Sequence, residues 1–210
     1  MPQSDDTAVP PIRSGYRLTI TLSTPIPLET KYGALTARYF RIGDNREGVV
    51  LSGSAPLSDP VFLRLQSSCL FSESFATTDC DCAQQLHASL ARITAQGGFC
   101  IYEFAEGRGA GLAAKFEAIQ LQSQEGLNTR QAYERLGLSP DPRDFSPIVQ
   151  LCEMAGIPRR VALATNNPGK IRAFEAAGFT VERVVLQLEI TPTIASYLQQ
   201  KRECLGHLDS

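Results

Sequence analysis

The sequence predicts a mixed α/β fold in one compact domain, residues 15–210, with a β-rich N-terminal part followed by alternating strands and helices. The length of 210 residues, with 43% hydrophobic and 20% charged residues, suits a single globular domain. Apolar and polar residues alternate from Arg17 to Leu22, as in a half-buried strand. After Cys82 the apolar period lengthens to that of a helix, and no linker separates the two parts.

Residues 1–14 are mostly polar and interrupted by prolines, which predicts a disordered leader. They have neither the basic start nor the apolar stretch of a signal peptide, and no run reaches the about 20 apolar residues that span a bilayer. We therefore expect a cytoplasmic protein with reduced cysteines and no membrane partner. A net charge of −2 gives no basic field that would attract nucleic acid.

Strand patterns fill the N-terminal part as far as about Leu65. After the alternation at 17–22 they recur at residues 34–40 and 48–51. Gly33 and the clusters at 43–45 and 58–60 predict the turns between these strands.

Helices and strands alternate in the rest of the chain. The first predicted helix follows Cys82, carries Leu86, Leu90 and Ile93 on one face and ends at Gly97. A strand is predicted next at 99–104, followed by a helix that the glycine-rich residues 106–111 open and by a short helix at 129–136. A further helix is predicted from residue 146, with Ser146 as its N-cap, and then a strand at 161–163. The last predicted elements are a loop at 165–170 with a helix after it, a strand near 181–188 and a final helix from 191.

Three of the six cysteines, Cys69, Cys80 and Cys82, are spaced Cys-x10-Cys-x-Cys. Thiolates at this spacing can face one metal ion, and three ligands leave one tetrahedral position open, as in catalytic zinc sites. The alternatives are three small apolar core residues or a disulfide pair. The pattern favours the metal, because cysteine pairs in cytosolic proteins more often serve metal binding or catalysis.

The remaining cysteines and both histidines have no ligand pattern. Cys100, Cys152 and Cys204 are predicted in the core or on neutral surface. His87, one turn into the helix after Cys82, could approach the metal as a fourth ligand, but its position away from the apolar face favours exposure, and His207 is predicted to be exposed. The site therefore has no evident histidine base, and proton transfer falls to a carboxylate or to metal-activated water.

Three loops offer groups that could bind an anion. Residues 106–111 combine glycines with Arg108 before a helix, which is typical either of an anion site or of a tight turn. Residues 165–170 follow a strand, where α/β folds bind ligands. Residues 141–144 concentrate charge around a proline, and alone they indicate a solvated loop.

In combination, these motifs resemble GTP cyclohydrolase II from about residue 25 to the C-terminus. The family pattern has a basic residue, Cys-x10-Cys-Asp-Cys, a glutamine, Glu-Gly-Arg, Asp-x-Arg-Asp-Phe and Thr-Asn-Asn-Pro-x-Lys. Here these motifs are Arg64, Cys69, Cys80-Asp81-Cys82, Gln85, Glu106-Gly107-Arg108, Asp141 to Phe145 and Thr165 to Lys170. The ending Leu205-Gly206-His207-Leu208 is also similar to that of the family.

The resemblance implies a zinc-dependent hydrolase of riboflavin biosynthesis that opens the imidazole ring of GTP. Zinc on Cys69, Cys80 and Cys82 would activate water to attack C8, formate would leave, and pyrophosphate would be released with Mg²⁺ shielding its charge. Asp141 matches the family's proton acceptor, and Arg143 matches a residue assigned as nucleophile on the α-phosphate. A guanidinium with a pKa above ~12 offers no free lone pair, so we interpret Arg143 as stabilising phosphoryl charge.

The resemblance also implies a nucleotide-binding site and a homodimer. Its substrate contacts fall on Arg64, Leu65, Gln66, Ser67, Ser68, Gln85, Glu106, Gly107, Arg108, Ile119, Thr129, Thr165 and Lys170. The chain is too short for a dihydroxybutanone phosphate synthase domain, so we expect none to precede this one.

Three positions depart from the family pattern. Ser68 replaces a glutamate, Ala105 a glutamine and Ile119 a tyrosine. Ile119 could instead continue an apolar stripe with Leu112 and Phe116 into the core. If the three departures share one pocket, the loss of polar groups predicts a changed substrate or product, because hydrogen-bonding sites discriminate strongly.

Three functions therefore stay open: a GTP cyclohydrolase, a related enzyme that acts on another nucleotide or heterocycle or stops at a formamide, and a non-catalytic nucleotide-binding protein. Retention of the three thiols together with Asp141 and Arg143 speaks against the last. A cytidine-type zinc deaminase is excluded, because neither His-x-Glu nor Pro-Cys-x-x-Cys occurs.

Overall fold

The computed structural model describes residues 19–209. The predicted leader, residues 1–14, lies outside this range. The described strands are β1 (Ile20–Leu22), β2 (Ile26–Thr30), β3 (Gly33–Ile42), β4 (Arg46–Gly53), β5 (Val61–Ser67), β6 (Phe99–Glu103), β7 (Arg160–Ala164) and β8 (Thr180–Val184). The helices are α1 (Leu70–Ser74), α2 (Cys82–Gln96), the 3-10 helix η1 (Glu106–Gly109), α3 (Gly111–Glu125), α4 (Thr129–Arg135), α5 (Ser146–Met154), α6 (Pro168–Ala176) and α7 (Pro192–Leu205).

All described strands belong to one mixed sheet, in the order β1-β3-β4-β6-β5-β7-β8 with β2 also paired to β3. The pairs from β1 to β6 are antiparallel, whereas β6, β5, β7 and β8 run parallel to one another. The predicted mixed α/β fold, with strands first and strand–helix alternation afterwards, is confirmed.

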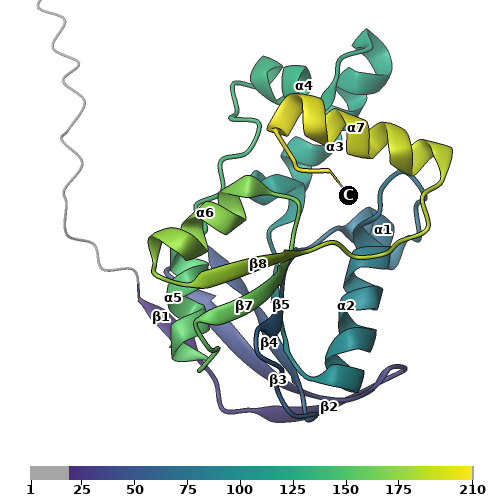
Figure 1. The fold of residues 1–210 in the computed structure, drawn as a ribbon. Coiled ribbons are helices and arrows are strands. Elements are labelled where there is room, and N and C mark those ends of the chain that lie inside the picture. The colour runs from purple at the N-terminus through teal and green to yellow at the C-terminus, as the bar shows by residue number, and fades with distance from the viewer. Residues whose placement is uncertain (1–18, 210) are drawn as a thin grey trace, which may run out of the picture.

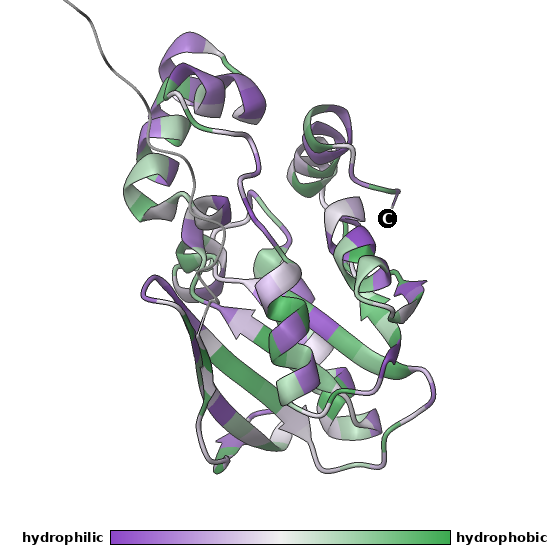
Figure 2. Cartoon of the chain, turned by 90° about the vertical axis from the view of Figure 1, so that its left-hand side faces the viewer, coloured by the Kyte–Doolittle hydropathy of each residue, from purple (hydrophilic) through white to green (hydrophobic). Residues whose placement is uncertain are grey.

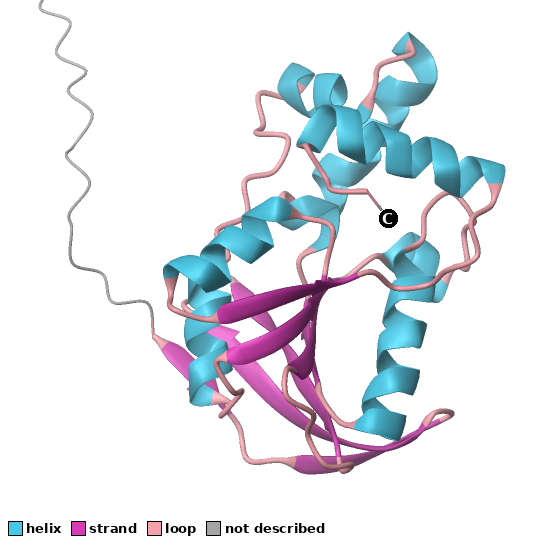
Figure 3. Cartoon of the chain, in the orientation of Figure 1, coloured by secondary structure: helices cyan, strands magenta, loops and turns pink. Residues whose placement is uncertain are grey.

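Helices cover both faces of the sheet (Figures 1 and 3). Helix α2 packs on one face, where Ile93 joins Leu51, Phe62 and Cys100 in a buried cluster. Helices α5 and α6 cover the opposite face, over a larger cluster that includes the fully buried Phe174. The middle strands carry the most hydrophobic residues, while α3, α4 and α7 mix both kinds (Figure 2).

The carboxyl ends of the parallel strands lie together at one edge of the sheet, where a site can form. Strands β5, β6 and β7 point the same way, so their carboxyl ends meet at a single edge. The segments that follow them contain Cys69, Glu106 and Thr165. Helix α7 lies beyond this edge, near α3 and α4 (Figure 1).

Several elements differ from their predictions at the level of a few residues. Strand β2 was not predicted, because its apolar residues Ile26 and Leu28 are exposed on an edge strand that contains a proline. The residue that caps α5 is Phe145 rather than Ser146. Lys170 lies in α6 rather than in a loop, because Asn167 caps that helix by accepting a hydrogen bond from the Gly169 amide (2.8 Å).

Three more differences concern helix and strand extents. The short helix α1 lies within the cysteine-rich stretch, where no helix was predicted, and β8 ends at Val184 instead of near residue 188. The stripe Leu112, Phe116 and Ile119 on α3 is 37%, 55% and 40% exposed, so it does not enter the core. Among residues 19–209, none of the helices has the length and apolar character needed to span a bilayer.

Candidate active site

A cavity of about 450 Å³ lies at the edge where β5, β6 and β7 end. Its walls come from the segments after these strands, from the loop between α1 and α2, and from α3, α4 and α7. A volume of this size falls in the range of small-molecule sites.

The three predicted metal ligands meet in this cavity. Cys69 precedes α1, Cys80 lies in the following loop and Cys82 is the first residue of α2. Their sulfur atoms all lie within 4.8 Å of one another, and Cys69 Sγ is 3.9 Å from Cys80 Sγ. Tetrahedral zinc with Zn–S bonds of about 2.3 Å needs sulfurs about 3.8 Å apart, so the cluster fits this ion. All six cysteines are free thiols in the structure.

A lysine of α3 supports the thiol cluster. Lys115 Nζ lies 3.4 Å from Cys69 Sγ and 2.7 Å from Glu106 Oε1, and the other carboxylate oxygen of Glu106 accepts from the Leu70 amide. Hydrogen bonds from Cys80 and Cys82, with Lys115 assisting, hold the pKa of the Cys69 thiol far below its ordinary value. A thiolate is the form that binds metal.

A buried polar network fixes one wall of the cavity. Arg64 donates to Gln66 Oε1 at 3.0 and 2.7 Å, to the Ala164 oxygen at 2.8 Å and also to Gln85 Oε1. Gln85 in turn donates to Asp81. Burial lowers the pKa of Arg64, and charge interactions with acidic groups nearby, Cys100 first, act in the opposite direction. These predicted substrate-binding residues are thus held in fixed orientations by each other.

The two predicted catalytic residues form a bidentate ion pair. Arg143 Nε and Nη2 each lie 2.6 Å from an oxygen of Asp141, and Asn167 Nδ2 lies 3.3 Å from Asp141 Oδ2. Burial would raise the pKa of Asp141, but the hydrogen bonds and charge of Arg143 outweigh it, and the net shift is downward. Arg143 lines the cavity and reaches Ser67 Oγ at 3.4 Å, whereas Asp141 stands behind it.

Lys170 brings a buried cation to the same region. Its Nζ donates to the Leu65 oxygen at 2.8 Å, and nearby Thr165 Oγ1 accepts from the Asn167 amide at 3.0 Å. Burial lowers the pKa of Lys170 well below its ordinary value, and Arg64 and Arg143 lower it further. An anionic ligand would offset this repulsion, which makes this end of the cavity suited to phosphate.

The glycine-rich segment forms a left-handed turn instead of leading directly into α3. Gly107 and Arg108 have φ of 57° and 59°, a conformation that costs energy for arginine. Tyr133 Oη donates to the Gly107 oxygen (3.1 Å), and Arg108 Nη1 donates to the Pro140 oxygen (3.1 Å). Strain held in place by such contacts is typical of functional sites.

Most of the predicted site residues line the cavity. These are Arg64, Gln66, Ser67, Ser68, Cys69, Cys80, Cys82, Gln85, Glu106, Gly107, Arg108, Ile119, Thr129, Arg143, Thr165 and Lys170. Leu65 belongs to the hydrophobic core, and only its backbone oxygen takes part, as the acceptor for Lys170. The three departures Ser68, Ala105 and Ile119 share the cavity, so Ile119 does not continue a stripe into the core.

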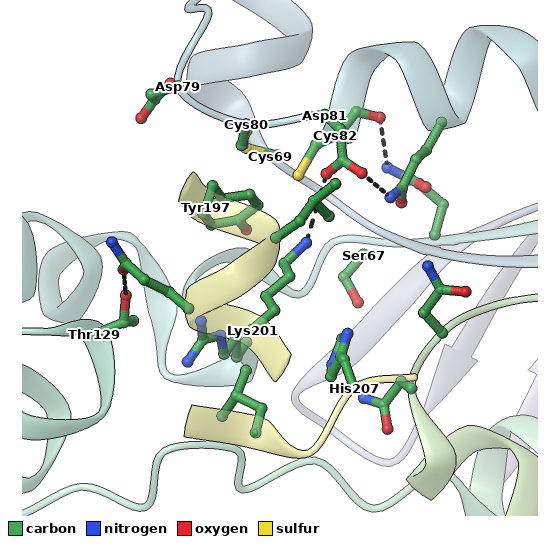
Figure 4. A pocket seen from close by; sticks show the side chains of 18 of the residues that line it. Ser67, Cys69, Asp79, Cys80, Asp81, Cys82, Thr129, Tyr197, Lys201 and His207 are labelled. Carbon is green, nitrogen blue, oxygen red and sulfur yellow. Dashed lines mark hydrogen bonds and ion pairs between the residues drawn. The ribbon is translucent and has the colours of Figure 1, made fainter. Parts of the chain in front are cut away.

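Helix α7 and its tail contribute residues that were not predicted for the site (Figure 4). Tyr197 and Lys201 are one turn apart on the cavity side, and Lys201 Nζ lies 3.5 Å from Asp81 Oδ1. The prediction that His207 is exposed is wrong, because its Nε2 is buried in the cavity wall. The exposure predicted for His87 is confirmed.

The signals for these residues in the sequence were incomplete. The spacing of Tyr197 and Lys201 places them on one helical face, and Lys115 shares a face of α3 with Ile119. Neither pattern says that the face meets a cavity, because that depends on contacts far apart in the chain.

The chain is similar to one protein family and to proteins that are named for riboflavin biosynthesis. A family model described as GTP cyclohydrolase II matches residues 22–186. The riboflavin biosynthesis protein RibBA of Bacillus velezensis is 40% identical over 202 residues, which cover 92% of this chain and 50% of that protein. RibBA of Bacillus subtilis is 39% identical over 204 residues, with 94% and 51% covered. The chain therefore spans about half the length of these relatives.

Among solved structures, RibBX from A. baumannii, a two-domain 3,4-dihydroxy-2-butanone 4-phosphate synthase, gives a TM-score of 0.41 at 14% identity. The match covers 81% of this chain and 41% of that one.

Proposed function

Because this chain belongs to the GTP cyclohydrolase II family, we propose that it is a zinc-dependent hydrolase that opens the imidazole ring of a purine nucleotide, GTP by default. Formate and pyrophosphate would be the products besides the opened nucleotide. The observation that carries the proposal is the placement of three thiols and a cationic wall in one cavity.

Zinc fits the three thiols and, when bound, would supply activated water for hydrolysis. Around it, Lys115 keeps Cys69 in the thiolate form, and Glu106 holds Lys115 in position. The bound purine would lie near these residues, between the thiols and Ser67.

The other end of the cavity would bind the phosphates. Arg143 offers a planar fork of donors, and Asp141 fixes the orientation of that fork. Lys170, whose pKa is lowered by burial and by the neighbouring arginines, would add a second positive charge once an anionic phosphate offsets that repulsion. Phosphoryl transfer is promoted by such fixed charges, so we assign Arg143 to charge stabilisation.

Asp141 would act as proton acceptor only after its pairing with Arg143 loosens. In the present geometry both of its oxygens bind the guanidinium, and its pKa is lowered. A phosphate that draws Arg143 toward itself would release one carboxylate oxygen. This step links phosphate binding to base catalysis.

Mg²⁺ would enter with the nucleotide rather than reside in the protein. The phosphate end of the cavity is cationic, and Asp141, the carboxylate beside it, is already paired with Arg143. Mg²⁺ is commonly held by substrate phosphates with few protein ligands.

A related enzyme with another nucleotide or another product is the second candidate. Ser68, Ala105 and Ile119 all line the cavity, and each lacks the larger polar group of the family pattern. Together they predict weaker discrimination for guanine, or a reaction that stops at the formamide.

A mass-spectrometric screen tests the proposal. Nucleoside triphosphates and monophosphates would be incubated with the zinc-loaded protein, and with Cys80→Ser as the blank. We expect one purine nucleotide to be consumed with release of pyrophosphate and formate. Binding of nucleotides without any consumption would contradict the enzyme and support a binding protein.

A further inference from the structure

The C-terminal tail returns to the cavity after α7 and is held there by backbone contacts. The Leu208 amide donates to the Asn166 oxygen at 2.8 Å, and Arg183 Nη1 donates to the Asp209 oxygen at 2.7 Å. His207 therefore occupies a defined place in the cavity wall.

The imidazole of His207 has a polar atom without a partner. Its Nε2 is buried and finds no hydrogen-bond partner among residues 19–209. Figure 4 shows the ring among the side chains that line the cavity, below Ser67 and to the right of Lys201. Buried polar atoms in native proteins are almost always hydrogen-bonded, so this atom indicates a missing ligand group.

The charges around His207 identify the chemistry of that group. Lys201 of α7, Arg143 of the loop before α5, Lys170 of α6 and Arg108 of η1 all act on it. Burial first, and then these four cations, lower the pKa of His207 to about 4, so the ring is neutral at pH 7 in the unliganded protein. An imidazole ring with four cationic side chains around it is well placed to bind an anion.

We propose that Nε2 of His207 binds a phosphoryl oxygen of the ligand and that the ring takes up one proton from solvent as it binds. The imidazolium N–H then donates a charge-assisted hydrogen bond, while the phosphate neutralises the cations that had kept the ring uncharged. That the phosphate belongs to a nucleotide rests on the proposed function. The contact with His207 itself requires only a phosphate group.

Nuclear magnetic resonance can test the protonation directly, because the chain has two histidines and His87 is exposed. The imidazole signals of the full zinc-loaded chain would be titrated with and without tripolyphosphate, with metal content checked before and after. We expect the pKa of His207 to start at about 4 and to rise by at least about two units on binding, which is what protonation of the ring near pH 6 requires, while the His87 signals stay unchanged. A His207 pKa that does not move at saturating tripolyphosphate would overturn the proposal.

Substitutions test the contact. His207→Ala should weaken tripolyphosphate binding about tenfold near pH 6, as expected for loss of one charge-assisted hydrogen bond. His207→Gln keeps an N–H donor near the position of Nε2, so it should retain most of the affinity but lose the proton uptake that calorimetry in buffers of different ionisation enthalpy detects. His87→Gln serves as the matched control and should match the unmodified chain.

Tripolyphosphate has no purine ring, so its binding tests the phosphate contact of His207 independently of the proposed reaction. Unchanged affinity and unchanged proton uptake in a folded His207→Ala variant would overturn the role of His207, even with normal nucleotide turnover. A normal His207 response in a protein that consumes no nucleotide would instead contradict the proposed reaction and leave the phosphate contact established.

Discussion

Cys69 has two kinds of neighbour, the other two thiols and the ammonium group of Lys115. The thiols direct hydrogen bonds at it and Lys115 adds positive charge, so negative charge collects on this sulfur. Zinc held by the three thiolates would extend the same arrangement, because ligation requires that the shared protons leave. The spacing in the sequence predicted the three ligands, but Lys115 and its partner Glu106 became apparent only in the structure.

The thiol cluster leads to the first prediction. Cys80→Ser should lose most bound zinc and all detectable ring opening, because two thiolates hold zinc far more weakly than three. Metal analysis and formate release measure the two effects. Cys204→Ala, at a buried cysteine of α7 outside the cluster, should keep its zinc. A full complement of zinc with normal turnover in Cys80→Ser would refute the ligand assignment.

The second prediction concerns the fork of Arg143. Arg143→Lys should lower pyrophosphate release by about a hundredfold or more, since an ammonium cannot form both contacts with Asp141 and point toward a phosphate at once. Quantification of pyrophosphate per nucleotide measures this, with Arg160→Lys, an exposed arginine of β7, as the matched control. Release at more than half the normal rate would show that the planar fork is not needed.

The third prediction concerns Ile119 and the step at which the reaction stops. Ring opening takes two hydrolytic steps, and the second expels an amine that needs a proton. Ile119 lines the cavity but has no polar atom, so we expect a formamide product to accumulate and Ile119→Tyr to restore formate release. Formate counted against consumed nucleotide gives the answer. One formate per nucleotide from the unmodified chain would show that Ile119 does not block the second step.

At the scale of elements, α7 connects the C-terminal end of the chain to the thiol loop. Lys201 approaches Asp81, a residue that is 1% exposed and lies between two of the cysteines. Lys201 Nζ also lies 4.2 Å from the ring centre of Tyr197. Burial alone would lower the pKa of Lys201, but charge interactions with Tyr197 and Asp81 outweigh burial, and the pKa is raised. The helix thus closes one side of the cavity through a buried ion pair.

The sequence predicted a last helix from residue 191, and α7 begins at Pro192 with Thr191 as its N-cap and with Ile194 and Leu198 buried. It could not predict that the tail beyond Gly206 turns back, because that turn is fixed by a contact with Asn166, far away in the sequence. The stripe on α3 shows the same limit, since the periodicity is the same whether a face meets the core, a cavity or a partner.

The fourth prediction tests the ion pair of α7. Lys201→Met should destabilise the protein by roughly 3 kcal/mol, because it leaves the buried carboxylate of Asp81 without its cation. It should also expose α7 to limited proteolysis before the rest of the domain unfolds. Arg202→Met, next to it but paired with the exposed Asp209, should change stability by less than about 1 kcal/mol. Equal stability of the two variants would show that the buried pair does not hold α7.

At the scale of the whole molecule, the sheet has two parts with different tasks. The antiparallel part, β1 to β4, supplies a scaffold, while the parallel part brings three strand ends to one edge, where the cavity forms. Alternation in the sequence was enough to predict these two parts and their order. The pairing of β5 between β6 and β7 was not predictable, because strands of similar hydrophobicity have no local signal for their neighbours.

Beside the cavity, an apolar patch at α1 and α3 is exposed within the part of the chain that the structure describes. Phe71 packs against Phe75 and Phe116, with ring centres 6.3 and 5.1 Å away, and Phe75 and Phe116 are 65% and 55% exposed. Leu112, one turn from Phe116 on α3, is also exposed. Contiguous exposed aromatic residues of this kind mark protein interfaces, so we propose this patch as the contact of the homodimer that the family resemblance implies.

The last prediction follows from the patch. The unmodified chain should sediment as a dimer at micromolar concentration, and Phe116→Ser should shift it toward the monomer by removing a central aromatic contact, with a loss in affinity of tenfold or more, about 2 kcal/mol. Met154→Ser, at a residue of α5 that is 51% exposed, is the matched control for loss of an apolar surface side chain elsewhere and should remain dimeric. Because Phe71 also lines the cavity, dissociation should lower nucleotide affinity as well, which calorimetry at matched protein concentrations would measure. A chain that sediments as a monomer at all concentrations, or a Phe116→Ser variant that stays fully dimeric, would exclude this patch as the dimer contact.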